Sequence, residues 1–185
     1  MKKNICAVAV FLFLFCLVSG LCAFDFSADV IMKNKQVGAQ KGKMFVSEEK
    51  MRMDAAGMTV ITRMDKKVAW ILITPQKMYM EQQVDTKMVV TDKYPDEIER
   101  KLLGEETVDG RKADKYLITV KKNGGTEKIH QWICKSTGIP LKTAAVDDSW
   151  SMEFKNLKEG GQNASLFEIP SGFSKMSMQM PQIPR

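Results

Sequence analysis

The sequence is poor in the residue types on which most catalytic centres depend. It has a single histidine, His130, and three of its four cysteines lie within the first 22 residues, which leaves Cys134. A nucleophile needs a base beside it, and His130 and Cys134 would lie more than about 13 Å apart along an extended strand. We therefore expect neither an enzyme nor a cofactor-binding protein.

The sequence also lacks any long block of like charge. Its 28 basic and 22 acidic residues are interspersed, and no basic run in the body of the chain exceeds Lys121-Lys122. No basic stretch interleaved with aromatic residues is present, so a nucleic-acid partner is not expected. The pattern predicts a solvated surface, membrane contact that is at most transient, and a monomer.

Residues 1–23 have the form of a cleaved export signal. Lys2 and Lys3 precede an apolar run over residues 5–17, which is short for a membrane span, and small residues follow it. The alternative, lipid attachment at Cys22, is disfavoured because the bulky Leu21 precedes that cysteine. We expect a periplasmic protein with one folded domain over residues 24–174 and a flexible, methionine-rich tail over residues 175–185.

Alternation of apolar and polar residues predicts β-strands along nearly the whole exported part. Successive side chains of a strand point to opposite faces, and turn residues recur at short intervals, which favours antiparallel pairing of sequence neighbours. We expect a mainly β chain, with a single curved antiparallel sheet of about ten or eleven strands forming an unclosed barrel. The expected strands cover residues 24–33, 37–47, 49–54, 58–64, 68–73, 77–84, 105–108, 112–122, 126–135, 139–146, 150–157 and 165–169.

One short helix is predicted over residues 95–103. Pro95 suits a helix start, acidic residues follow it, and Gly104 suits a helix stop. Its apolar residues would pack on the sheet as a helical lid, because so short a helix is unstable alone. These lid residues are Ile98, Leu102 and Leu103.

Thirteen of the fourteen methionines lie beyond the export signal, and three interpretations of them are open. They fill the core, or they line an adaptable apolar cavity, because methionine is flexible and polarizable. In the third interpretation, Met176, Met178 and Met180 of the tail bind copper(I) through their thioethers. Core filling and cavity lining are compatible, because the wall of a cavity in a curved sheet is also core.

Three segments in order resemble the lipoprotein-carrier-like (LolA/LolB-like) superfamily. They are VITRMDKK at 60–67 with Trp70 and KMYM at 77–80, then WICKSTGIPLK at 132–142, then FEIPSGF at 167–173. Arg63 matches a position of the superfamily's pattern, whereas Cys134 stands where aspartate is commoner. The resemblance is to an uncharacterised branch of small exported bacterial proteins, and it implies an unclosed antiparallel barrel around an apolar cavity with a helical lid.

These observations together predict an exported binding module that holds a lipid, an acyl chain or a lipidated partner, in outer-membrane lipoprotein or lipid trafficking. The alternatives are a structural or stress-sensing envelope protein that binds another protein, and copper(I) binding by the tail. The residues expected to line the cavity are Met51, Met53, Met58, Val60, Met64, Trp70, Leu72, Met78, Met80, Trp132, Met152 and Phe154.

Overall fold

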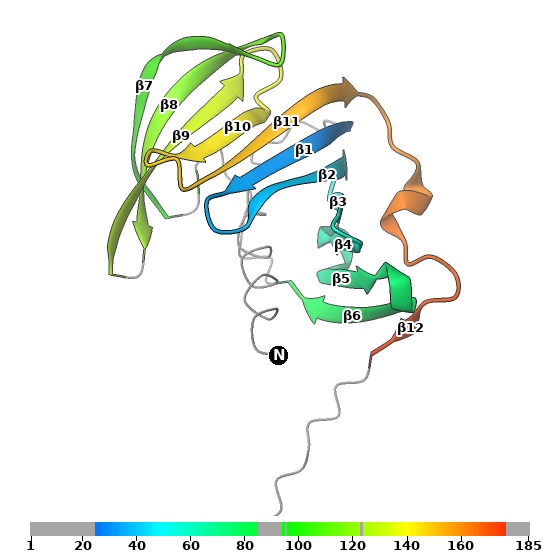
Figure 1. The fold of residues 1–185 in the computed structure, drawn as a ribbon. Helices are drawn as coiled ribbons and strands as arrows, with labels where there is room; N and C mark the ends of the chain where they lie inside the picture. The colour runs from blue at the N-terminus through cyan, green and yellow to red at the C-terminus, as the bar shows by residue number, and fades with distance from the viewer. Residues whose placement is uncertain (1–24, 85–93, 95, 123, 177–185) are drawn as a thin grey trace, which may run out of the picture. The chain divides into compact units, whose positions relative to one another are not determined.

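The computed structural model of this chain describes residues 25–84, 94, 96–122 and 124–176. These residues form twelve β-strands and three short 3₁₀-helices, and no α-helix occurs among them. No helix in the described ranges is long and apolar enough to cross a membrane. The expectation of a mainly β chain is therefore confirmed (Figure 1).

The strands hydrogen-bond side by side in the order β12-β6-β5-β4-β3-β2-β1-β11-β10-β9-β8-β7. This order has two ends, and β12 and β7 do not pair with each other within the described ranges, so the prediction of one sheet that does not close is confirmed. Neighbouring strands pair in the antiparallel sense from β2 to β6 and from β7 to β11, whereas β12 runs parallel to β6. The chain clusters into two compact units, and β1, β2 and β11 contribute residues to both.

The first unit contains Val30–Gln40 and the described part of Lys87–Asn156. Its long antiparallel strands bury an apolar cluster of Ile118, Val120 and Ile129, against which Tyr116 and Trp150 pack. Its strands, with the shared strands given in full, are β1 (Phe26–Asn34), β7 (Glu97–Val108), β8 (Arg111–Lys122), β9 (Gly125–Cys134), β10 (Pro140–Ala145) and β11 (Trp150–Glu159).

The second unit contains Phe24–Asp29, Lys41–Thr86 and Leu157–Arg185, as far as they are described. Its four central strands are six residues long and joined by tight turns, so that sequence neighbours pair directly. Its elements, with β2 given in full, are β2 (Gly38–Ser47), β3 (Lys50–Ala55), β4 (Met58–Arg63), η1 (Met64–Lys66), β5 (Val68–Ile73), η2 (Thr74–Gln76), β6 (Met78–Gln83), η3 (Ala164–Phe167) and β12 (Ser174–Lys175).

The helix predicted over residues 95–103 is wrong, because Glu97–Val108 forms the strand β7. β8 supplies backbone partners along the whole of β7, and a two-turn helix has no comparable support. Glu97, one of the acidic residues that suggested a helix start, pairs locally with Arg100. Gly104 lies within the strand at a register shift.

Three further differences concern the ends of elements. The strand expected over residues 165–169 is wrong, because Ala164–Phe167 is the 3₁₀-helix η3, whose start is capped by the Asn163 side chain accepting from the Ser165 amide. Ser174 and Lys175 form β12, so the sheet extends beyond residue 174. The export signal, Pro95 and residues 177–185, including Met178 and Met180, lie outside the described residues.

The hairpin turn predicted at Asp109-Gly110 is present in the structure. Both residues have positive φ, 49° and 76°, and they join β7 to β8 in a two-residue hairpin loop. Such loops need left-handed backbone at both central positions, which glycine adopts freely and aspartate tolerates. The hairpin dipeptide therefore fixes the register of the two longest strands.

Candidate functional site

The second unit contains a sheet face that is rich in methionine, which we call the methionine face. Directly paired residues of neighbouring strands point to the same side of a sheet, so the registers of β2 to β6 define this face. One row crosses all five strands from β2 to β6, and two others flank it. The rows are Met44–Met53–Val60–Ile71–Met80, then Val46–Met51–Thr62–Ala69–Gln82, and then Gly42–Ala55–Met58–Ile73–Met78.

Burial on the methionine face differs from residue to residue. Met44, Met53 and Ile71 are buried, with at most 5% of each exposed. Met51, Met58, Met78 and Met80 are half-buried. Half-buried methionines present flexible thioether chains that adapt to apolar partners of varied shape. The face therefore has the chemistry of an adaptable apolar binding surface.

The opposite face of the same strands is closed by the chain's own C-terminal segment, residues 163–175, which we call the strap. Phe167 of η3 is 1% exposed and packs with Ile61, Trp70 and Leu72. Fully burying a phenylalanine side chain is worth about 2–3 kcal/mol. This face is therefore occupied within the described structure and does not offer the apolar surface that the methionine face offers.

Two arginines hold the strap in place. Arg52 donates to the Leu166 carbonyl at 3.0 Å, and Arg63 donates to the Phe167 carbonyl at 3.2 Å. Arg63 also forms ion pairs with Asp65 (2.6 Å) and with Glu168 of the strap. Its hydrogen bonds to Asp65 and Glu168 hold the pKa of Arg63 well above its ordinary value, so the charge persists although the residue is buried.

The pH dependence of the strap follows from its carboxylates. Burial raises the pKa of Glu168, but hydrogen bonds from Arg63 and Lys66 outweigh it and leave the pKa lowered. The hydrogen bond from Arg63 likewise lowers the pKa of Asp65. A carboxylate whose folded pKa is lowered stabilises the fold above its unfolded pKa, and that contribution is lost as the pH falls through the folded value.

We therefore expect the melting temperature to fall as the pH drops below about 4, where these carboxylates are protonated. The measurement is a series of thermal melts across that range for the protein and for Glu168→Gln. The variant should lose part of its stability at neutral pH and show a shallower acid decline. Glu49→Gln, at an exposed position of the turn between β2 and β3, is the control, and an acid decline unchanged by Glu168→Gln would contradict the assignment.

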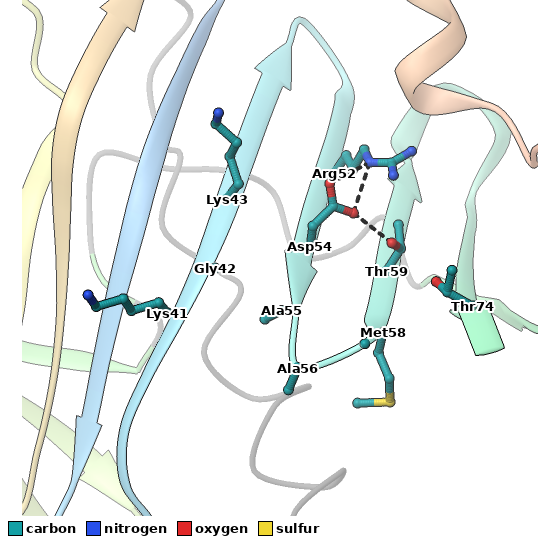
Figure 2. A pocket seen from close by; sticks show the side chains of 11 residues that line it. Lys41, Gly42, Lys43, Arg52, Asp54, Ala55, Ala56, Met58, Thr59 and Thr74 are labelled. Carbon is teal, nitrogen blue, oxygen red and sulfur yellow. Dashed lines mark hydrogen bonds and ion pairs between the residues drawn. The ribbon is translucent and has the colours of Figure 1, made fainter.

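A shallow depression lies at the β3–β4 end of the second unit (Figure 2). Within it, Asp54 accepts two hydrogen bonds from Arg52 Nε at 3.0 Å and one from Thr59 Oγ1 at 2.6 Å. Figure 2 shows Met58 extending away from this polar group. Asp54 thus links Arg52 of its own strand to Thr59 of β4, and the group fixes β3 against β4.

The structure brings together half of the residues predicted to line a cavity and separates the rest. Six of them share the methionine face: Met51, Met53, Met58, Val60, Met78 and Met80. Trp70 and Leu72 lie on the opposite face beneath the strap, and Met64 lies in η1. The alternation of side chains along β5 could have separated these residues from the methionine face. Trp70 and Leu72 point to the opposite side of the strand from Ile71, which lies between them.

The first unit contains the other three predicted lining residues, and its Trp132 is covered by lysines. Lys115 and Lys142 lie over the ring at 4.9 and 4.7 Å, and Trp132 Nε1 donates to Glu106 at 2.7 Å. Met152 pairs with Thr143 of β10, and both are buried, as is Phe154. Contacts of the Trp132 ring with the ammonium groups and aliphatic chains of these two lysines therefore account for its burial within its own unit.

Cys134 and His130 share one face of β9 but do not form a site together. Burial raises the pKa of the Cys134 thiol, and hydrogen bonds from Ser136 and Thr137 outweigh it, bringing the pKa to about 7. Burial lowers the pKa of His130, whose ring lies edge-on to Trp132 at 5.8 Å. Within the described residues, no group of three or more His, Cys, Asp or Glu side chains is placed to hold a metal.

The architecture is shared with solved structures of MucB. A Pseudomonas aeruginosa MucA/MucB complex matches with a TM-score of 0.51 and 16% identity, covering 77% of this chain and 55% of that one. A crystal structure of MucB in complex with MucA(peri) matches with a TM-score of 0.52 and 16% identity, covering 80% and 55%. This chain therefore spans about half the length of the chains that it matches there.

The matches also include a LolA superfamily protein from Nitrosomonas europaea, with a TM-score of 0.37, 10% identity, and coverage of 82% of this chain and 92% of that one. The lipoprotein-carrier-like fold predicted from the sequence is confirmed by the fold shared with the MucB structures. Residues 26–138 match the family described as Domain of unknown function (DUF4412), and the chain belongs to that family. No curated protein sequence matches it.

Proposed function

We propose that this chain is an exported envelope protein that holds an acyl chain or a similar apolar ligand on the methionine face. The observation that carries the proposal is the register of β2–β6, which gathers six methionines on one side of adjacent strands. A face that had only to fill a core could use more rigid side chains, whereas methionine suits ligands of varied shape. The location follows from the signal expected over residues 1–23.

Binding would come mainly from burial of apolar surface and would need no chemical step. Each buried methylene contributes about 0.8 kcal/mol, which corresponds to about fourfold in affinity. A medium-length acyl chain in contact with the half-buried Met51, Met58 and Met80 would therefore bind usefully even if part of it stayed in water. The charged rim at Lys41 and Lys43, near the β3–β4 turn, would remain solvated.

A series of saturated fatty acids of increasing length, displacing a fluorescent acyl probe from the purified protein, tests this proposal. We expect saturable binding of the probe, and an affinity that rises by up to about fourfold per added methylene until the face is filled. The control is a soluble alcohol or carboxylate with a very short chain, which should not compete. No probe binding, or affinity independent of chain length, would contradict an apolar ligand.

A second candidate function is the binding of another envelope protein. It is favoured by the matched MucB structures, which are complexes of MucB with MucA. Under this alternative the methionine face would contact apolar side chains of a partner polypeptide. A partner captured in fixed proportion, together with an absence of chain-length dependence in the fatty-acid series, would favour it over the acyl-chain proposal.

A further inference from the structure

The strand β7 presents a concentration of exposed apolar side chains that the proposed function does not use. It has twelve residues, lies at one end of the strand order, and pairs with β8 along a single side among the described strands. Ile98, Leu102 and Leu103 are 60%, 55% and 46% exposed. An exposed edge strand is a template for pairing with another strand, and apolar side chains on it mark an interaction surface.

The sequence of β7 is complementary to itself when it is read in the antiparallel sense about Arg100. That register places Ile98 opposite Leu102 twice, and Glu99 opposite Lys101 twice. The first pairing places two apolar side chains together, and the second places opposite charges together. Both kinds of cross-strand pair stabilise neighbouring strands. Neither Glu99 nor Lys101 forms an ion pair within the described residues, so both charges remain for a partner strand.

We propose that two copies of this chain associate through β7, edge to edge and antiparallel, about a twofold axis at Arg100. The two Arg100 side chains would face each other, and each is already neutralised by its own Glu97 at 2.9 and 2.7 Å. Each also lies over the ring of its own Tyr116 at 5.2 Å. A twofold contact uses the same patch on both copies, as this self-complementary register requires.

The extent of the contact is set by two irregularities of β7. The register against β8 shifts at Ile98, between Glu97 and Glu99, and again at Leu103, between Leu102 and Gly104, so the segment that can pair with the second copy is short and ends at Ile98 and Leu102. Bulges of this kind limit pairing at sheet edges. The dimer is therefore weak and depends on concentration, and the monomer expected from the sequence is the form that dominates in dilute solution.

Disulfide cross-linking between introduced cysteines tests the proposed register of the two β7 strands directly. Ile98→Cys and Leu102→Cys proteins are prepared separately, mixed and oxidised, with the buried Cys134 left in place. Directly opposite residues of antiparallel strands lie within disulfide distance, whereas equivalent positions on the two copies do not in this register. We expect a disulfide-linked dimer from the mixture and none from either protein alone.

Sedimentation equilibrium supplies the independent measurement. The unmodified protein should dimerise as concentration rises, and the double variant Ile98→Lys/Leu102→Lys should weaken the dimer at least about tenfold by placing like charges opposite each other. Val37→Lys, which changes an exposed apolar residue in the turn between β1 and β2, should leave it unchanged. Unchanged thermal melts would show that all variants fold. A monomer at every concentration, or cross-linking of Ile98→Cys with itself, would overturn the proposal.

Discussion

Replacing Phe167 by alanine should destabilise the protein by about 3 kcal/mol, one of the two largest effects that the structure predicts. Phe167 is almost completely buried against Ile61, Trp70 and Leu72, and its removal would leave a cavity beneath the strap. The measurement is the free energy of unfolding from chemical denaturation. For a chain of this size the melting temperature should fall by about 6–12 °C.

The matched control for this change is Phe173→Ala in the same strap. Phe173 packs against the same cluster but is only partly buried, so its loss removes less apolar contact and should cost about 1 kcal/mol. Equal effects of the two substitutions, or a Phe167→Ala protein as stable as the parent, would contradict the role given to the strap. Retained fatty-acid binding in either variant is expected, because the methionine face lies on the other side of the strands.

Introducing carboxylates on the methionine face should abolish most acyl-chain binding. In Met51→Glu/Met80→Glu, two half-buried methionines of β3 and β6 become charged, and an acyl chain laid over them would have to desolvate those charges. We expect the affinity for a fatty acid to fall at least about tenfold, which corresponds to about 1.4 kcal/mol. Displacement of the fluorescent acyl probe measures it.

The control for this pair is Met51→Leu/Met80→Leu, which keeps both positions apolar and of similar volume. Swaps of this kind usually cost less than about 1.5 kcal/mol of stability, so the protein should fold and retain binding within a few-fold. Both double variants should be compared by thermal melting before binding is measured. If the folded glutamate variant binds fatty acid as tightly as the parent protein does, the ligand does not bind on the methionine face and the proposal is contradicted.

Much of the sheet could be predicted because alternation and turn residues are local signals. Asp109-Gly110 specifies its hairpin through backbone geometry, and the five tightly joined strands from β2 to β6 follow from short alternating segments. The helix over residues 95–103 failed because Ile98, Leu102 and Leu103 fit a helical spacing equally well. Pairing with β8 decided the outcome, and a single sequence does not reveal such tertiary pairing.

Which of the two faces the strap covers was harder to predict. Arg63 stood out in the sequence through a motif, yet its contacts to Phe167 and Glu168 join residues more than a hundred positions apart. No local pattern states which face of β4 such a segment will cover. Once the strap is seen to occupy the face of Trp70 and Leu72, the methionines on the other face become the available apolar surface.

The most direct test of the acyl-chain proposal is native mass spectrometry of the protein purified from its own envelope without added lipid, followed by extraction and identification of what it carries. The account predicts a bound species whose mass corresponds to one molecule with an acyl chain. It also predicts that this species is lost in Met51→Glu/Met80→Glu and kept in Met51→Leu/Met80→Leu. A protein that carries no such molecule, and that acquires none when fatty acid is supplied, would contradict the account.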